Sequence, residues 1–183
     1  MNQEKRWCII SNNCYGLNYY KKNKYEYNTP FVGLFLYSPD YIRLLENFEH
    51  YMAIEPVPLP NSRSKYNPSS KYPIGIIDNA IEIHFLHDTS IDIALEKWNR
   101  RKARMPMQMN HYLFKLCDRD QFNEEIGLRF CQLPFQHKVM FISQCYHKHF
   151  MSNTSTRIIE IPMKETPTGD LLERICGVPE ELV

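Results

Sequence analysis

Two short apolar runs in this sequence end in nearly the same series of polar residues. Residues 7–10 are apolar and lead into Ser-Asn-Asn-Cys-Tyr at 11–15, and residues 139–142 lead into Ser-Gln-Cys-Tyr at 143–146. Each run has the length of a buried strand, and the residues after it are too polar for a core. We therefore predict two strand ends that face a common site. The likeness also suggests an internal duplication, with half-repeats around 6–55 and 138–183.

Segments with the pattern of strands alternate with segments that have the pattern of helices. Strands are expected at 6–11, 74–77, 81–86, 112–117, 138–143 and 157–161, and the apolar run 31–36 is either another strand or a buried segment. Helix starts are indicated by Ser38-Pro39-Asp40, by residues 87–90 and by residues 123–125, and a last short helix is expected at 170–176. The first of these helices should end before Pro56, and Asp78-Asn79 should form a tight turn between two short strands. This alternation is typical of βαβ units. The sequence therefore predicts an α/β fold, with a mainly parallel or mixed sheet and helices on both faces.

Length and composition fit one globular domain over residues 1–183 and narrow the classes of partner. Hydrophobic residues make up 43% of the chain, and 22 basic residues nearly balance 21 acidic ones. Nucleic-acid binding usually needs a clearly basic face, so no nucleic-acid partner is expected.

No run approaches the about 18 apolar residues of a membrane helix, and no signal peptide opens the chain. The six cysteines form no CxxC pair. We therefore expect a cytoplasmic protein with reduced thiols.

Polar side chains follow four of the expected strands. In parallel sheets, ligands bind outside the carboxyl ends of the strands, so these groups are the candidate site. The candidates for binding a polar ligand such as a sugar are Ser11, Asn12, Asn13, Tyr15, Arg119 and Ser143. Hydroxyl and amide groups supply both donors and acceptors for such a ligand. An equally good interpretation of residues 11–13 is that they cap the helix that follows.

The segment Asp118-Arg119-Asp120 has the Asp-x-Asp form of a metal-dependent glycosyltransferase. Carboxylate oxygens bind hard divalent cations, and the cation neutralises a leaving diphosphate. On this interpretation Asp118 and Asp120 are metal ligands and catalytic residues, and a divalent cation is the cofactor. The alternative is an acidic turn that caps the helix beginning near residue 123.

His87 is the third candidate catalytic residue, because it stands with Asp88 at a strand end and could act as a general base. His84 would point to the opposite face of that strand. Cys14 and Cys145 could be nucleophiles, but a thiol needs a nearby base, and no feature of the sequence supplies one. Inert, half-buried thiols are the alternative. A cysteine-dependent transferase would require Cys14 to react with a thiol probe faster than Cys8.

Several short motifs follow one another in a distinctive order. They are Ile-Ile-Ser-Asn-Asn-Cys-Tyr-Gly at 9–16, Thr-Pro-Phe-Val-Gly-Leu-Phe at 29–35, Ser-Pro-Asp-Tyr at 38–41, Leu-Leu-Glu-Asn at 44–47, Lys-Tyr-Pro-Ile-Gly at 71–75, Ile-Glu-Ile-His-Phe-Leu-His at 81–87, Glu-Lys-Trp-Asn-Arg-Arg-Lys at 96–102, Asp-Arg-Asp at 118–120 and Leu-Pro-Phe at 133–135. In these motifs the chain resembles a bacterial family of unknown function whose members are often labelled exopolysaccharide biosynthesis proteins. The resemblance covers roughly residues 7–142. It implies an α/β fold with internal duplication and a link to capsule or surface polysaccharide.

Two functions follow as hypotheses. The first is an enzyme of surface-polysaccharide metabolism that transfers a group to or from a sugar or sugar-nucleotide. The second is a non-enzymatic carbohydrate-binding or assembly protein, which the balanced charge and the 12 tyrosines favour. The sequence leaves open whether the chain forms a homo-oligomer.

Overall fold

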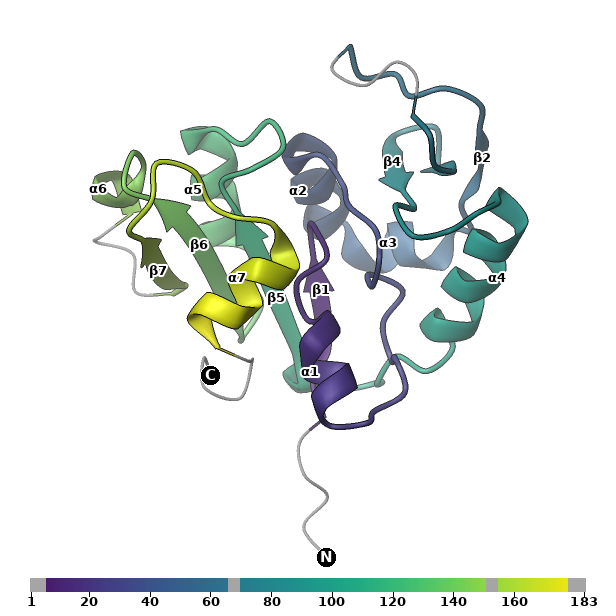
Figure 1. The fold of residues 1–183 in the computed structure, drawn as a ribbon, viewed down its shortest axis with the longest axis horizontal. Helices are drawn as coiled ribbons and strands as arrows, with labels where there is room; N and C mark the ends of the chain where they lie inside the picture. Colours follow the sequence, from purple (N-terminus) through teal and green to yellow (C-terminus); the bar gives the residue numbers. More distant parts are fainter. Residues whose placement is uncertain (1–5, 66–69, 151–154, 178–183) are drawn as a thin grey trace, which may run out of the picture.

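A four-stranded parallel sheet organises the protein, seen in a computed structural model that describes residues 6–65, 70–150 and 155–177 (Figure 1). Its strands, in spatial order, are β1 (Cys8–Ser11), β5 (Tyr112–Cys117), β6 (Lys138–Ser143) and β7 (Arg157–Ile161). A second, antiparallel sheet has the order β2 (Val57–Leu59), β3 (Ile74–Ile77) and β4 (Ile81–His84). The predicted α/β fold with a mainly parallel sheet is confirmed.

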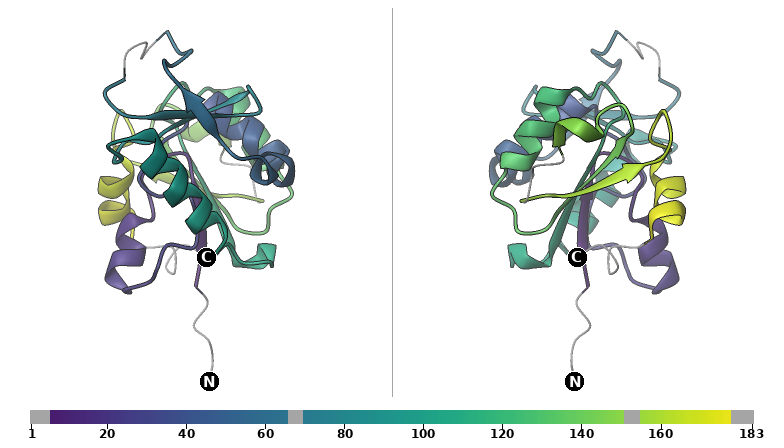
Figure 2. Two further views of the ribbon diagram at one scale, coloured as in Figure 1. Left: turned by 90° about the vertical axis from the view of Figure 1, so that its right-hand side faces the viewer. Right: turned by 90° about the vertical axis from the view of Figure 1, so that its left-hand side faces the viewer.

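Helices cover both faces of the parallel sheet (Figure 2). One face carries α2 (Ser38–Glu46), α3 (Phe48–Ala53), α5 (Glu124–Gln132) and α6 (His147–Phe150). The other face carries α1 (Leu17–Lys22) and α7 (Gly169–Cys176). The remaining helices are α4 (Ile91–Lys102), which packs against the first core, and the single turn η1 (Met109–His111).

The strands of the parallel sheet read as continuous apolar runs because helices cover them on both sides. Along β5 and β6 every residue is buried, and alternate side chains enter opposite cores. Phe114 and Leu116 pack with α2 and α5, whereas Leu113 and Cys117 pack with α1 and α7. Lys115 lies between Phe114 and Leu116 in this alternation and pairs in register with Ser11 of β1.

One detail of the predicted elements is wrong, and two others are decided by the structure. Residues 31–36 are the buried segment and not a strand; Phe35 makes a single bridge to His84, and Gly33 adopts φ +79°, which interrupts an extended segment. The helix expected from Ser38 ends at Glu46, because Asn47 has non-helical dihedral angles, and α3 follows separately. The expected turn at Asp78-Asn79 is confirmed as the hairpin between β3 and β4, with both residues at positive φ.

The two similar strand ends belong to the same sheet, but they are not neighbours. β5 lies between β1 and β6, and all three strands run parallel. Nothing in residues 6–65, 70–150 and 155–177 shows the internal duplication that the repeated signature suggested. Within those ranges, no helix combines the length and the hydropathy needed to cross a membrane.

Candidate functional site

A cavity of about 320 Å³ opens at the carboxyl end of β1 and β5, beside the first turn of α7. We call it the Cys14 cavity. The residues that line it are Asn13, Cys14, Phe35, Leu86, His87, Arg119, Asp120, Thr168, Gly169 and Asp170. It therefore joins the ends of two parallel strands, the segment after β4 and the segment after β7. This is the edge of the sheet at which the sequence predicted a site.

The Cys14 thiol contacts the His87 imidazole inside this cavity. The distance from Cys14 Sγ to His87 Nε2 is 3.7 Å, and Sγ lies 3.8 Å from the carbonyl oxygen of Leu34. Burial raises the pKa of the Cys14 thiol, the Asp170 and Asp120 carboxylates raise it further, and Lys115 opposes them. Cys14 is thus a protonated thiol at neutral pH, with a base in contact.

The local sequence explains how these two side chains meet. Cys14 follows β1 in a tight turn that ends at Gly16, whose φ of +97° suits glycine and whose added Cβ would lie 2.8 Å from Ile9 Cδ1. His87 comes from the second sheet, three residues beyond the end of β4. Gly33 lies beside it, because a Cβ at that position would be 3.5 Å from the His87 ring. The contact therefore depends on the packing of the two sheets against the segment between them.

Asn13 links the Cys14 turn to the sheet. Its Oδ1 accepts hydrogen bonds from Lys115 Nζ at 2.8 Å, from Tyr15 N at 3.2 Å and from Ser11 Oγ at 3.3 Å. Its Nδ2 donates to Cys117 Sγ at 3.1 Å. Asn13 is thus held in one orientation while one part of it borders the cavity.

Ser11, Asn12 and Tyr15 lie beneath the turn. Ser11 and Asn12 are fully buried, and Asn12 Oδ1 accepts from Lys115 Nζ at 3.1 Å. Tyr15 is 1% exposed; its ring packs on Phe141, and the Lys115 ammonium lies 5.5 Å from the ring centroid. These three candidate ligand-binding residues do not line the Cys14 cavity, and they support the residues that do.

Lys115 is the most important residue of the site that the sequence analysis did not select. It is 0% exposed, and burial lowers the pKa of its ammonium group. Its hydrogen bonds to Asn12 and Asn13 place a cation directly under the Cys14 turn. The available signal was a single lysine inside the apolar run Tyr112–Cys117, since such a residue is rarely buried without a partner.

The acidic segment after β5 divides between two environments. Asp120 borders the Cys14 cavity at φ +56°, and burial raises its pKa against the opposing effect of Arg119. Asp118 instead turns toward β6, where its Oδ2 accepts hydrogen bonds from Ser143 N at 2.8 Å and Ser143 Oγ at 2.5 Å. Arg119 donates from Nη1 to the carbonyl oxygen of Thr166 at 2.8 Å.

A second cavity of about 430 Å³ adjoins the first. We call it the Asp118 cavity; its lining residues are Asp118, Arg119, Asp120, Ser143, Cys145, Tyr146, Lys164, Glu165 and Thr166. Arg119 and Asp120 line both cavities. Among the described residues, no group of three or more His, Cys, Asp or Glu side chains is arranged to hold a metal ion. The candidate metal ligands Asp118 and Asp120 therefore gain no third protein ligand from that part of the chain.

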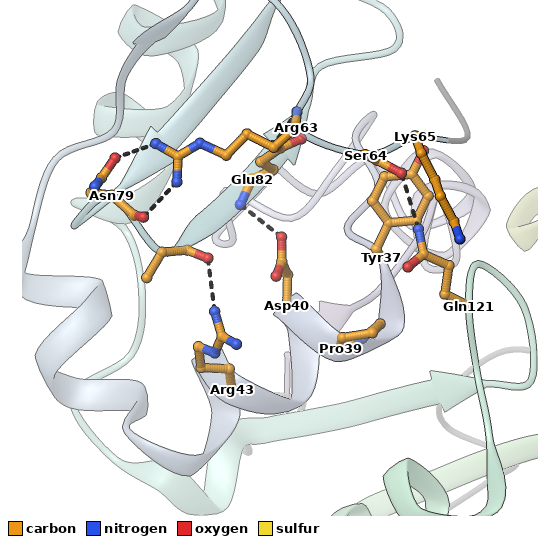
Figure 3. A pocket seen from close by; sticks show the side chains of 11 residues that line it. Tyr37, Pro39, Asp40, Arg43, Arg63, Ser64, Lys65, Asn79, Glu82 and Gln121 are labelled. Atoms are coloured by element: carbon orange, nitrogen blue, oxygen red, sulfur yellow. Dashed lines mark hydrogen bonds between the residues drawn. The ribbon is translucent and has the colours of Figure 1, made fainter. Parts of the chain in front are cut away.

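A third pocket, of about 400 Å³, lies between α2 and the β3–β4 hairpin (Figure 3). Its charged side chains Asp40, Arg43 and Arg63 are bonded to backbone groups and to the Asn79 side chain of the same pocket. Both guanidinium Nη atoms of Arg63 bind Asn79, Arg43 binds the carbonyl oxygen of Ala80, and Asp40 Oδ2 accepts from Glu82 N at 3.0 Å. Because these contacts are internal, we regard this pocket as a structural junction.

The structure thus gathers four of the nine candidate residues, Asn13, His87, Arg119 and Asp120, in the Cys14 cavity. Asp118 and Ser143 line the neighbouring cavity. Sequence reasoning did not select Phe35, Asp170 or Thr166. Phe35 stands in an apolar run, and Asp170 and Thr166 belong to the region after β7, where no motif pointed to a site.

Comparison with known proteins identifies a family to which no activity is assigned. A family model described as "Domain of unknown function (DUF1919)" matches residues 2–173. An uncharacterized protein of Haemophilus influenzae is 32% identical over 165 residues, which cover 90% of this chain and 73% of that protein. Neither description mentions exopolysaccharide or capsule. On the extent of the match, the chain belongs to the DUF1919 family.

Proposed function

We propose that this protein is a cysteine-dependent acyltransferase in which Cys14 is the nucleophile and His87 is the general base. The observation that carries the proposal is the 3.7 Å contact between Cys14 Sγ and His87 Nε2 inside a cavity. A thiol and an imidazole in contact are the minimum set for covalent acyl transfer, because the imidazole accepts the thiol proton as sulfur attacks. The carboxyl end of a parallel sheet is also the usual place for such a site.

The raised pKa of Cys14 sets the order of events. The resting thiol is neutral, so His87 must remove its proton as Sγ attacks the carbonyl carbon of an acyl thioester or ester. The bond from carbon to the leaving group then breaks, and His87 returns the proton to that leaving group. The product is a Cys14 thioester. Because the first turn of α7 borders the cavity, its positive dipole end favours the negative charge that develops on the carbonyl oxygen.

A sugar hydroxyl is the acceptor that we favour. Asp120 and Asp170 border the cavity and offer oxygens to hydroxyl groups, and Phe35 supplies an aromatic ring. The resemblance described above supports the same class of substrate, and a role in surface polysaccharide is part of the proposal on that ground alone. Transfer from a sugar-nucleotide through a cation at Asp118 and Asp120 is less well supported, because Asp118 Oδ2 already binds Ser143.

A non-enzymatic sugar-binding protein is the second candidate. The raised pKa of Cys14 favours it, because a protonated thiol is a weak nucleophile. The two candidates differ in one measurable property, which is covalent turnover at Cys14.

The test uses p-nitrophenyl acetate as an acyl donor and mass spectrometry to locate the acetyl group. We expect a burst of p-nitrophenol and acetylation of Cys14 in the wild-type protein. Cys14→Ser should abolish the acetylated peptide, and His87→Gln should slow the burst by about 100-fold, the usual scale of general-base catalysis. Cys145→Ala is the control, because Cys145 is exposed and lies outside the Cys14 cavity. Equal burst rates in the wild type and in His87→Gln would refute the proposal.

A further inference from the structure

A fourth pocket, of about 310 Å³, is bounded by α1, by α4 and by the segments that follow α1 and β4. We call it the Lys97 pocket. It meets the Cys14 cavity, because His87 lines both, and His87 Nε2 lies 3.7 Å from Cys14 Sγ. The pocket therefore begins one residue away from the reactive thiol. Its polar and charged lining residues are Lys21, Tyr27, His87, Asp88, Lys97 and Arg101.

Positive charge dominates the Lys97 pocket. Lys21, Lys97 and Arg101 bring three cations to it, and Asp88 brings the only carboxylate among the described residues that line it. Lys21 comes from α1 and is exposed. Lys97 and Arg101 stand four residues apart on α4, so they lie on one face of that helix. Cations from two helices thus border one cavity, which favours the binding of an anion.

The Asp88 carboxylate does not neutralise this charge. Lys97 Nζ donates to Asp88 Oδ1 at 2.5 Å. Burial lowers the pKa of the Arg101 guanidinium and Asp88 opposes this effect, so the same carboxylate acts on both cations of α4. An arginine stays charged in proteins. One negative charge is therefore shared by two positive ones, and Lys21 adds a third positive charge.

Arg101 is held in position while most of its donors stay unused. Its Nη1 donates to the carbonyl oxygen of Val32 at 2.8 Å, and its guanidinium carbon lies 4.8 Å from the centroid of the Tyr27 ring. Val32 and Tyr27 both line the Lys97 pocket, so the charged end of Arg101 lies at the wall of that pocket. A guanidinium has several further N–H donors. Within the described part of the chain, the bond to Val32 is the one hydrogen bond that this side chain makes.

We propose that the Lys97 pocket binds a phosphate group of the acyl donor, which makes the donor an acyl thioester or ester of a phosphorylated carrier. The inference rests on the proposed function and adds the class of donor. Arginine pairs with two phosphate oxygens at once through its planar set of N–H groups, and lysine adds a flexible point charge. Arg101, together with Lys97 and Lys21, supplies that combination.

The Cys14 cavity is a poorer place for the same phosphate. The carboxylates of Asp120 and Asp170 outnumber the guanidinium of Arg119 there. A phosphate would therefore be repelled from the Cys14 cavity and attracted to the Lys97 pocket. This difference in charge orients the donor, with its phosphate in the Lys97 pocket and its acyl group beside the thiol.

His87 lies between the two ends of a donor bound in this way. As Cys14 Sγ forms a bond to the acyl carbonyl carbon, His87 takes the thiol proton. The bond from that carbon to the sulfur or oxygen of the carrier breaks, and His87 returns the proton to that atom. The products are the Cys14 thioester and the free carrier, whose phosphate holds it in the Lys97 pocket until it dissociates.

The first experiment measures binding alone, so it does not depend on the reactivity of Cys14. Phosphopantetheine and pantetheine differ by one phosphate group and serve as carriers without an acyl group. Each is titrated into the reduced protein and followed by calorimetry, with and without inorganic phosphate. We expect phosphopantetheine to bind about tenfold or more tightly than pantetheine, as charge-assisted hydrogen bonds imply. Inorganic phosphate should compete with phosphopantetheine, because both occupy the same pocket.

Variants of the two arginines of α4 locate the phosphate. Arg101→Gln should reduce the ratio of the two affinities to near one. Arg100→Gln is the matched control, because it makes the same change on the adjacent residue, which is 51% exposed, pairs with Glu96 and lies outside the pocket. Lys21→Gln is the second variant, since the replacement of an exposed side chain leaves the fold intact. It should weaken the binding of phosphopantetheine about two- to fivefold.

Three results of the binding experiment would overturn the inference. The first is that the two carriers bind equally or that neither binds. The second is that Arg101→Gln keeps the wild-type preference for the phosphorylated carrier. The third is that Arg100→Gln loses the preference to the same extent, because the phosphate would then respond to the net charge of α4 and not to this pocket.

The second experiment compares S-acetylphosphopantetheine with S-acetylpantetheine as acyl donors and follows acetylation of Cys14 by mass spectrometry. We expect the second-order rate constant to be about tenfold or more higher for the phosphorylated donor, and Arg101→Gln to bring the two donors to similar values. Acetylation of Cys14 without a preference between the donors refutes the phosphate site and leaves the Cys14 chemistry intact. A preference in binding without any acetylation refutes the acyltransferase, and the donor role of the pocket with it.

Discussion

Substitution of Gly169 by alanine sets two physical effects against each other. Gly169 is the first residue of α7, and alanine is favoured over glycine in helices by about 1 kcal/mol. An added Cβ, however, would lie 2.3 Å from Tyr15 N, 2.6 Å from Asn13 Oδ1 and 2.7 Å from the Cys14 carbonyl carbon. Two of these atoms belong to the backbone of the Cys14 turn, and the third is held by Lys115. The neighbours therefore cannot yield without moving the turn.

We expect the steric effect to dominate. Overpacking a well-ordered site costs about 1–3 kcal/mol, and the overlap here is close to 1 Å on ordinary contact distances, which places the cost near the top of that range. After the gain in helix propensity, Gly169→Ala should lower the free energy of unfolding by about 2 kcal/mol. For a chain of this length that corresponds to a fall in melting temperature of about 4–8 °C.

Urea denaturation followed by circular dichroism measures this difference directly. Leu171→Ala is the matched control, because it introduces the same residue in the same helix at a position that is 43% exposed. We expect that variant to change stability by less than about 0.5 kcal/mol. A Gly169→Ala protein that is as stable as the wild type, or more stable, would show that α7 does not pack closely against the Cys14 turn.

Three further predictions concern buried charges. Burial lowers the pKa of His84 to about 4, below its usual 6.5. The neutral imidazole therefore contributes to the stability of the folded protein above pH 6.5, and this contribution is lost as the pH falls through 4. His84→Gln should remove about 3 kcal/mol of this dependence of stability on acid, as measured by urea titrations. Asp170→Asn should lower the pKa of Cys14 and speed its alkylation by iodoacetamide at pH 7, and an unchanged rate would show that the carboxylate does not act on the thiol. Lys115→Met leaves acceptors on Asn12 and Asn13 without their donor and should cost about 2 kcal/mol in urea denaturation, whereas a gain in stability would mean that burying the ammonium is the larger effect.

The sequence predicted the parts of the fold that depend on local pattern. The strands β5 and β6 are apolar throughout because both faces are covered, and such runs are recognisable without knowledge of their neighbours. The helix start at Ser38-Pro39 was also recognisable from the local sequence, because proline is favoured in the first turn of a helix. The break at Asn47 was not, because the pattern of apolar residues continues through it and only the non-helical dihedral angles of Asn47 show where α2 ends.

The sequence predicted only the part of the site that follows from the parallel topology of the sheet. Residues after β1, β5 and β6 meet at one edge because parallel strands end on the same side. His87 reaches that edge from the antiparallel sheet, and no periodicity in a single strand can indicate a contact between two sheets. For this reason Cys14 had no visible base in the sequence. The repeated Ser-Cys-Tyr signature was also a poor guide to role: Ser11 binds Asn13 within its own turn, whereas Ser143 binds Asp118 from the adjacent strand.

One returning segment borders both cavities, and this makes the contribution of each cavity to acylation separable by experiment. The chain after β7 supplies Thr166 to the Asp118 cavity, and then Thr168, Gly169 and Asp170 to the Cys14 cavity. Displacing the start of α7 with Gly169→Ala should therefore disturb the Cys14 turn and slow acylation. Thr166→Val changes one side chain of the Asp118 cavity without moving that helix, so it should leave the rate of acylation unchanged. If both variants slow acylation equally, the two cavities act as one site.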